Sequence, residues 1–245
     1  MIVIPMAGLS SRFFKAGYDK PKYMLEAHGK TLFEHSVSSF QAYFKTERFL
    51  FIVRDVFHTP EFVRQKATSL GIYDFDVVIL SAETRGQAET VSMGLESCKA
   101  YEGSLTIFNI DTFRPSFTYP KESLMGDGYL DVFIGEGANW SFAEPKGDSS
   151  NRVLKTAEKK PISNLCCTGL YYFKHINDYL NSYTDYLEKP VVEWENGELF
   201  VAPLYNHLIQ SGLDIRFNTI SRHDVIFCGV PSEYTEFLDI KPKNM

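Results

Sequence analysis

A short loop near the start of the chain combines small residues with basic side chains. The residues concerned are Ala7, Gly8, Ser10, Ser11, Arg12 and, after a spacer, Lys22. Glycine and small neighbours let a backbone approach a phosphate closely and point N–H groups at it, and serine hydroxyls add donors. Arginine can hold two phosphate oxygens with parallel hydrogen bonds, and lysine can neutralise charge on a departing pyrophosphate. The loop therefore predicts a phosphate site at which Arg12 and Lys22 act.

The rest of the chain is acidic, so this basic loop is a local feature. The formal net charge is −6, which argues against nucleic acid as a partner, because binding a phosphate backbone requires a basic face. No apolar run approaches the roughly 20 residues that a membrane-spanning helix requires. The first residues indicate a buried strand with no basic leader, and we expect a cytoplasmic location.

The cysteines do not predict a metal site. Cys98, Cys166, Cys167 and Cys228 form no C-x-x-C pair and have no histidine at a zinc-binding spacing. Cys166 and Cys167 are adjacent, so they would point to opposite faces of a strand. We interpret all of these cysteines as reduced structural thiols.

Strand and helix patterns alternate through the first half of the chain. They predict strands at 2–5, 49–53, 77–80 and 105–110, and helices at 31–45, 60–70 and 87–100. Thr31 is a plausible cap of the first long helix. The alternation predicts an α/β fold, a Rossmann-like three-layer sandwich whose central sheet is mostly parallel or mixed and is covered on both faces.

The alternation of strands and helices does not continue after Pro120. The second half predicts strands at 130–135, 140–143, 152–157 and 167–173, and helices at 176–187, 203–211 and 231–238. Internal repeats, heptads and low-complexity segments are absent from the sequence. We therefore predict a single domain over residues 1–245.

Asp111 follows the apolar strand at 105–110. Open α/β sheets bind ligands at the carboxyl ends of their strands, so the loops after residues 5, 80 and 110 should converge. A carboxylate beside a triphosphate is well placed to hold Mg²⁺, which makes Asp111 the candidate metal ligand. The alternative is that Asp111 only caps its loop.

The first loop fits a longer signature. A strand, the pattern A-G-x-[GS]-[ST]-R-[FM], a spacer and K-P-K resemble the sugar-phosphate nucleotidyltransferase family, also called nucleoside-diphosphate-sugar pyrophosphorylases. The resemblance implies that the loop wraps a nucleoside triphosphate, that Arg12 activates its β and γ phosphates, and that Lys22 contacts the reacting phosphates. Ser10 stands where many members of the family have glycine.

Three later motifs also resemble the family. Arg85-Gly86-Gln87-Ala88 stands where the family has G-T-A, and the resemblance implies that Gly86 lies against the nucleobase. Glu158 and Lys159 resemble an E-K-P motif that binds the hydroxyls and the phosphate of the acceptor. Gly169, in a G-x-Y-x-F pattern, would make room for a sugar ring. From the residues alone, Gly86 could simply begin a helix, and the charges at 158–160 could be an exposed run.

One position departs from the family. Phe227 stands where relatives have an aspartate in D-x-G-T-P that serves as a second metal ligand. Asp224 could replace it only with a rearranged backbone. We therefore expect Asp111 to hold Mg²⁺ without a second aspartate.

The resemblance implies a nucleotidyltransferase. It would transfer a nucleoside monophosphate from a triphosphate to a sugar 1-phosphate or similar phosphorylated alcohol, by direct displacement and with release of pyrophosphate, for capsule or other surface polysaccharide precursors. Residues 1–120 would be the nucleotide-binding half and 121–245 the acceptor-binding half. Whether the chain forms a homo-oligomer is open. The alternatives are a nucleotide-sugar-dependent glycosyltransferase, which normally has a D-x-D motif, and a non-catalytic nucleotide-binding regulatory homologue.

Overall fold

The computed structural model describes residues 1–98, 100–147 and 150–240. Its internal contacts divide the chain into two compact units. Unit 1 consists of Met1–Val3, Thr84–Phe108 and Tyr119–Arg222, and unit 2 of Ile4–Glu83, Asn109–Thr118 and the chain from His223. Each unit is therefore built from segments that lie far apart in the sequence. The single domain with halves meeting near residue 120 stays a prediction.

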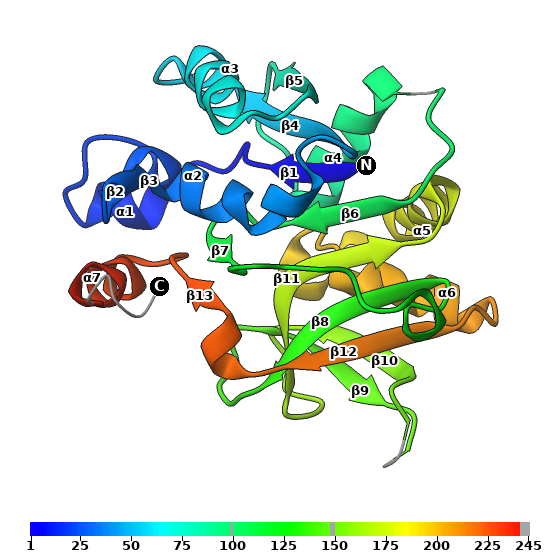
Figure 1. Cartoon of the computed structure of the whole chain (residues 1–245). Coiled ribbons are helices and arrows are strands. Elements are labelled where there is room, and N and C mark those ends of the chain that lie inside the picture. Colours follow the sequence, from blue (N-terminus) through cyan, green and yellow to red (C-terminus); the bar gives the residue numbers. More distant parts are fainter. Residues whose placement is uncertain (99, 148–149, 241–245) are drawn as a thin grey trace. The chain divides into compact units, whose positions relative to one another are not determined.

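Unit 1 contains a mixed sheet centred on β11 (Leu165–Phe173) (Figure 1). β11 pairs antiparallel with three strands, β6 (Leu105–Phe108), β8 (Gly128–Ile134) and β9 (Ser141–Pro145). The outer pairs are β9 with β10 (Val153–Glu158), antiparallel, and β8 with β12 (Ile215–Ile220), parallel. The first residues of β1 (Ile2–Pro5) pair parallel with β6. The predicted mixed character of the sheet is confirmed.

The α-helices of unit 1 begin close to where the sequence predicts. They are α4 (Gln87–Leu95), α5 (Ile176–Glu188) and α6 (Tyr205–Gln210). The 3₁₀ turns after Lys121 are Glu122–Leu124, Val191–Glu193, Glu195–Gly197, Ala202–Leu204 and Arg222–Asp224, which ends in unit 2. A further 3₁₀ turn, Glu96–Cys98, follows α4, and residue 99 of the predicted helix lies outside the described residues.

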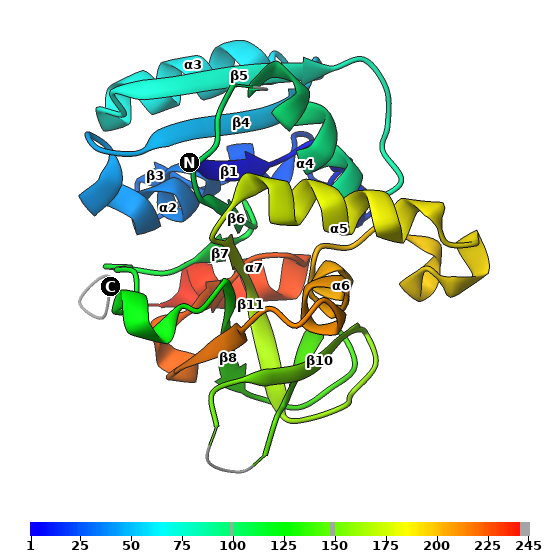
Figure 2. The same cartoon turned by 90° about the vertical axis from the view of Figure 1, so that its right-hand side faces the viewer.

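In unit 2, a parallel strand pair is covered by a helix. β4 (Arg48–Arg54) pairs in parallel with β5 (Asp74–Leu80), and α3 (Thr59–Leu70) lies along them (Figure 2). Pro60 suits the first turn of α3 because that turn needs no backbone donor, and Gly71 ends the helix at a φ of 82°. The strands and the helix predicted here are confirmed, each slightly longer than expected.

Thr31 caps α2 (Leu32–Val37), as predicted. Its hydroxyl accepts the Glu34 N–H at 3.2 Å, and the Glu34 carboxylate accepts the Thr31 N–H at 2.8 Å. This reciprocal pair satisfies two amides that a helix start leaves unpaired. The chain then tightens into a 3₁₀ segment, Ser38–Tyr43, so the predicted helix at 31–45 is only partly α-helical.

Short elements complete unit 2 around an aromatic core. They are α1 (Ser11–Lys15), a 3₁₀ turn at Lys22–Met24, β2 (Glu26–Ala27), β3 (Lys30–Thr31), β7 (Thr112–Phe113), β13 (Ile226–Phe227) and α7 (Pro231–Asp239). β2 pairs with β3, and β7 with β13, antiparallel in both cases. The core beneath them contains Phe13, Leu25, Leu32, Phe113, Cys228, Tyr234 and Phe237.

All four cysteines are free and buried. Burial raises the pKa of the Cys166 thiol to about 11 and raises that of Cys167 well above its ordinary value, so these thiols stay protonated and unreactive. In the described part of the chain, every helix is too short or too polar to cross a bilayer.

Candidate active site

The first loop of unit 2 presents its basic side chain to solvent. Arg12 and Phe13 are neighbours in α1; Phe13 is fully buried in the aromatic core, whereas Arg12 is exposed. Among the described residues, nothing hydrogen-bonds or ion-pairs with the Arg12 guanidinium. Burial of Phe13 therefore fixes the short helix and leaves Arg12 available to an anion.

Packing does not explain the glycine in this loop. Gly8 is exposed, and a Cβ atom added to it would meet nothing within 4 Å. Ala7, one residue earlier, is buried, and the chain before it is held by a 2.9 Å bond from the Met6 N–H to the Ile52 carbonyl. The loop therefore starts at a fixed strand end and extends into open space. Its backbone can approach a ligand closely at Gly8.

Ser10 has a backbone conformation that favours glycine. Its φ is 53°, in the left-handed region that L-residues enter at a cost of roughly 1–2 kcal/mol. The Ser10 hydroxyl accepts the Lys22 N–H at 3.2 Å. Glycine at this position could not make this hydrogen bond, because it has no hydroxyl. The hydrogen bond to Lys22 therefore offsets part of the backbone strain at Ser10. Ser11, the next residue, is exposed at the start of α1.

Lys22 and Asp111, 89 residues apart in the sequence, meet in unit 2. The Lys22 Nζ atom donates to Asp111 Oδ2 at 2.6 Å, and both side chains are about four-fifths buried. The backbone carbonyl of Asp111 accepts the Cys228 N–H at 2.8 Å. A Cβ atom on Gly229 would lie only 3.1 Å from Asp111 Oδ2, so glycine leaves room at this carboxylate.

Phe227 and Asp224, the two residues considered for a second metal ligand, have different surroundings in the structure. Phe227 is buried in β13, where it pairs with Thr112 of β7. Asp224 is exposed, and its backbone carbonyl accepts a hydrogen bond from the Arg114 guanidinium at 2.9 Å. The described residues contain no group of three histidine, cysteine or acidic side chains that could hold a metal.

The donor set fits Mg²⁺ when a triphosphate supplies the other ligands. Mg²⁺ is commonly bound by one or two carboxylates together with substrate phosphates and water. Asp111 provides one partly exposed carboxylate. Glu233, which sequence reasoning missed, lies near this carboxylate, and its Oε2 atom accepts the Gly229 N–H at 2.7 Å and the Val230 N–H at 3.1 Å. Its position three residues into α7 is the available signal, because that is where a helix-capping acid stands.

In unit 1, the nearby backbone of Leu199 explains why residue 86 is glycine. A Cβ atom there would lie 2.5 Å from the Leu199 carbonyl oxygen and 2.6 Å from the Leu199 nitrogen. Leu199 donates its N–H to the Arg85 carbonyl at 3.0 Å, and its carbonyl accepts the Ala88 N–H at 2.8 Å. Gly86 is therefore required by a close backbone approach within the protein, and its contact with a nucleobase stays a prediction.

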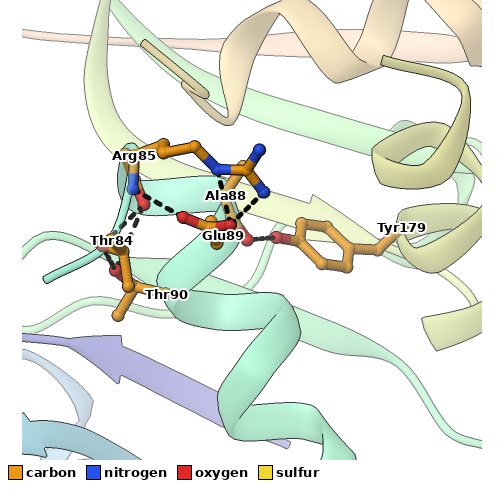
Figure 3. A network of polar contacts seen from close by, with 7 residues as sticks. Thr84, Arg85, Ala88, Glu89, Thr90 and Tyr179 are labelled. Carbon is orange, nitrogen blue, oxygen red and sulfur yellow. Dashed lines mark hydrogen bonds and ion pairs between the residues drawn. The ribbon is translucent and has the colours of Figure 1, made fainter. Parts of the chain in front are cut away.

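A polar network fixes the loop before α4 (Figure 3). The Glu89 carboxylate accepts the Arg85 N–H at 2.6 Å and the Arg85 Nε–H at 2.8 Å. The Thr84 and Thr90 hydroxyls lie 2.7 Å apart. On the other side of α4, the Tyr179 hydroxyl donates to the Ala88 carbonyl at 2.6 Å. The backbone around Gly86 is thus held from several directions.

The predicted acceptor carboxylate is buried beside hydroxyl groups. Glu158 is 8 % exposed, and its Oε2 atom accepts a hydrogen bond from the Ser141 hydroxyl. Ser141 Oγ lies 3.1 Å from the hydroxyl oxygen of Tyr171, which is buried, as a core residue should be. Sequence reasoning missed Ser141, because only the pairing of β9 with β10 places it opposite Glu158.

Lys159 and Gly169 both have backbone conformations that redirect a strand. Lys159 follows the end of β10 with a φ of 52°, and its N–H donates to the Trp140 carbonyl at 2.8 Å. Gly169 has a φ of 92° within β11, where the register with β8 shifts between Cys167 and Tyr171. This bulge gives a backbone reason for glycine. Whether it also makes room for a sugar ring stays a prediction.

Burial raises the pKa of the Glu158 carboxyl. The Ser141 hydrogen bond and the charge of Lys159 lower it, whereas Glu195 and Glu198 raise it, and the net shift is upward. A carboxyl with a raised pKa takes up protons on folding, so its charged form destabilises the fold above that pKa. The destabilisation disappears once the pH falls below the ordinary glutamate pKa of about 4.3.

Replacement of Glu158 by glutamine is therefore expected to raise the thermal midpoint near neutral pH. The gain should shrink as the pH falls and vanish well below the ordinary glutamate pKa of about 4.3, where glutamate is protonated in both the folded and the unfolded state. Melting curves of both proteins across this range measure it. Exposed Glu193, changed to glutamine, is the matched control. A Glu158 variant that is less stable than the native chain at neutral pH would contradict the raised pKa of Glu158.

The predicted site residues thus fall into two groups. Those of the first loop, with Lys22 and Asp111, belong to unit 2. Gly86, Glu158, Lys159 and Gly169 belong to unit 1.

The matches to known proteins all come from solved structures. Protein-family models and curated proteins give no match. The chain is 62% identical to the nucleoside-diphosphate-sugar pyrophosphorylase from Vibrio cholerae RC9, with a TM-score of 0.95 over 98% of this chain and 100% of that one.

Two more distant structures share the fold. The inositol-1-phosphate CTP transferase from T. maritima has a TM-score of 0.73 at 15% identity, over 97% of this chain and 93% of that one. A UDP-glucose pyrophosphorylase complexed with UDP-glucose has a TM-score of 0.71 at 14% identity, over 97% and 96%. The predicted Rossmann-like α/β fold is confirmed.

Proposed function

Because the chain belongs to the family of nucleoside-diphosphate-sugar pyrophosphorylases, which are sugar-phosphate nucleotidyltransferases, we propose that it joins a nucleoside monophosphate to a phosphorylated sugar or alcohol. A nucleoside triphosphate is the donor and pyrophosphate is the product. The observation that carries the proposal is the 2.6 Å contact between Lys22 and Asp111 beside the open loop at Gly8. This contact supports the proposal, because it joins an ammonium group that could bind the phosphates to a carboxylate that could hold Mg²⁺.

The reaction we propose is a direct displacement. The phosphate of the acceptor attacks the α phosphorus of the triphosphate, and the bond to the leaving pyrophosphate breaks, so no protein nucleophile is needed. Exposed Arg12 binds the β and γ phosphates, and Lys22 moves from Asp111 to the reacting phosphates. Mg²⁺ on Asp111, when bound, would neutralise phosphate charge.

In this proposal the acceptor binds in unit 1. The Glu158 carboxylate accepts hydrogen bonds from acceptor hydroxyls, and Lys159 binds the acceptor phosphate. The buried setting of Glu158 supports this role, because a hydrogen bond made away from water contributes strongly to selectivity. We also propose a cytoplasmic location and a role in making precursors of capsule or other surface polysaccharides.

Pyrophosphate release tests the proposal. The common nucleoside triphosphates are crossed with sugar 1-phosphates and phosphorylated alcohols in the presence of Mg²⁺. Release should require both substrates, and Arg12→Ala should reduce it by about 100-fold or more, because a charge-assisted contact to the transferred phosphates is lost. Lys15→Ala is the matched control, since Lys15 is an exposed basic residue of the same helix.

Other outcomes would favour the alternatives. Nucleotide binding without release across a broad panel would indicate a regulatory homologue, which the phenylalanine at position 227 favours. Consumption of a nucleotide sugar without any triphosphate would indicate a glycosyltransferase. Equal loss of activity in the Arg12 and Lys15 variants would contradict the role of Arg12.

A further inference from the structure

A short segment of unit 1, residues 194–200, contacts both residues predicted to bind the acceptor. It begins at the buried Trp194, includes a 3₁₀ turn, and ends at the half-buried Phe200. Its contacts suggest that it supports the acceptor-binding side chains from behind.

The segment is anchored at both ends. The Trp194 indole N–H donates to the Lys189 carbonyl at 3.1 Å, and the Arg85 guanidinium carbon lies 5.4 Å from the centre of the Trp194 ring. At the other end, the Leu199 backbone is hydrogen-bonded to Arg85, in the loop before α4, and to Ala88, in the first turn of α4. Between them, the Glu195 N–H donates to the Tyr186 hydroxyl at 2.9 Å. Because the segment is fixed at these points, it can hold the residues that it contacts in place.

The first contact with the acceptor residues is made by Glu195. Its Oε2 atom accepts a hydrogen bond from the backbone N–H of Glu158, the residue that ends β10. Because β10 lies at the edge of the sheet, next to β9, the Glu158 N–H that faces away from β9 depends on a partner from another segment. Glu195 therefore fixes the backbone from which the Glu158 side chain projects towards Ser141.

The second contact is made by Phe200. The Lys159 Nζ atom lies 4.5 Å from the centre of the Phe200 ring, a cation–π distance. The left-handed backbone of Lys159 turns the side chain away from the strand direction. A lysine side chain is flexible, so holding its ammonium over a ring removes conformations that could not reach a bound phosphate.

We propose that Glu195 and Phe200 are positioning residues for the acceptor. Glu195 fixes the Glu158 backbone, and Phe200 pre-orients the Lys159 ammonium for the acceptor phosphate. The inference rests on the proposed function, because it assigns these residues to the acceptor side of that reaction. It predicts that disturbing either contact weakens use of the acceptor and leaves use of the nucleoside triphosphate almost unchanged.

The kinetic test uses substitutions at Phe200. Phe200→Leu keeps an apolar side chain but removes the ring, and it is expected to raise the KM for the acceptor about five- to tenfold, as loss of a cation–π contact and of preorganisation would. The KM for the triphosphate and kcat should change less than about twofold. Phe200→Trp should restore the native acceptor KM, since tryptophan provides the best ring face. Glu195→Ala should resemble Phe200→Leu, with the exposed Glu193→Ala as matched control.

Lysine labelling tests the same contact without substrates. Reductive methylation followed by mass spectrometry measures the modification of Lys159 against that of exposed Lys160 in the same peptide region. Phe200→Leu should increase labelling of Lys159 several-fold and leave Lys160 unchanged, because only Lys159 loses its ring. This result holds even if no substrate pair releases pyrophosphate, so failure of the proposed function is distinguishable from failure of this inference.

Two results would overturn the proposal. One is an unchanged acceptor KM together with unchanged labelling of Lys159 in the Phe200→Leu protein. The other is an equal rise in both KM values with a lowered thermal midpoint that Phe200→Trp also shows, which would mean that Phe200 only supports the fold.

Discussion

Replacement of Asp111 by asparagine is expected to lower the rate of pyrophosphate release by about two to three orders of magnitude, the usual effect of removing one electrostatic contact from a transition state. Asparagine has nearly the same shape, and its carbonyl oxygen can still accept from Lys22. What is lost is the negative charge that faces the Lys22 ammonium at 2.6 Å and that would hold Mg²⁺. Steady-state kinetics at saturating Mg²⁺ and substrates measure the effect.

Asp224→Asn is the matched control for this experiment. It makes the same change at an exposed aspartate whose backbone carbonyl, not its carboxylate, contacts Arg114. Its rate should stay within about twofold of the native rate, as for surface substitutions in general. If both variants lose activity equally, or if the Asp111 variant keeps its rate, the assignment of the metal site to Asp111 is wrong.

The second large effect is expected from Gly86→Ala. The added methyl group would lie 2.5 Å from the Leu199 carbonyl oxygen and 2.8 Å from its carbonyl carbon. Leu199 cannot retreat without losing its hydrogen bonds to Arg85 and Ala88, at 3.0 and 2.8 Å. Overpacking of this kind costs about 1–3 kcal/mol, which would lower the thermal midpoint by several degrees.

Gly8→Ala provides the contrast. A Cβ atom at Gly8 meets nothing within 4 Å, so stability should be unchanged, whereas affinity for the triphosphate should fall if this loop wraps the phosphates. Thermal melts and nucleotide titrations of the two variants separate the effects. Full stability of the Gly86 variant would show that Leu199 can move, and would remove the structural reason for that glycine.

The sequence predicted elements that have a long, regular apolar pattern and missed those that do not. β4, α3 and α5 have such patterns and were predicted. β7 and β13 have two residues each, which is too short for any period. β12 pairs with β8 and is mostly half-exposed, so its residues have a weak apolar signal.

The site could be predicted where its chemistry is contiguous in the sequence. The loop from Ala7 to Arg12 has its small and basic residues side by side. The meeting of Lys22 with Asp111 required the fold, although each residue was singled out beforehand. Contacts that depend on strand register or on a distant segment, such as Ser141 or Glu195 with Glu158, leave no local pattern to find.

The interleaving of the two units has a consequence for synthesis of the chain on the ribosome. Unit 2 contains the segment Ile4–Glu83, which is made early, and also the chain from His223, which is made late. The Tyr234 hydroxyl donates to the Glu26 carbonyl at 2.7 Å, across 208 residues. At about 5–20 residues per second, the ribosome needs roughly 10–40 s to add the second partner. During that interval the nascent loop lacks α7, and its aromatic core is incomplete, so the growing chain exposes apolar rings that a chaperone could shield.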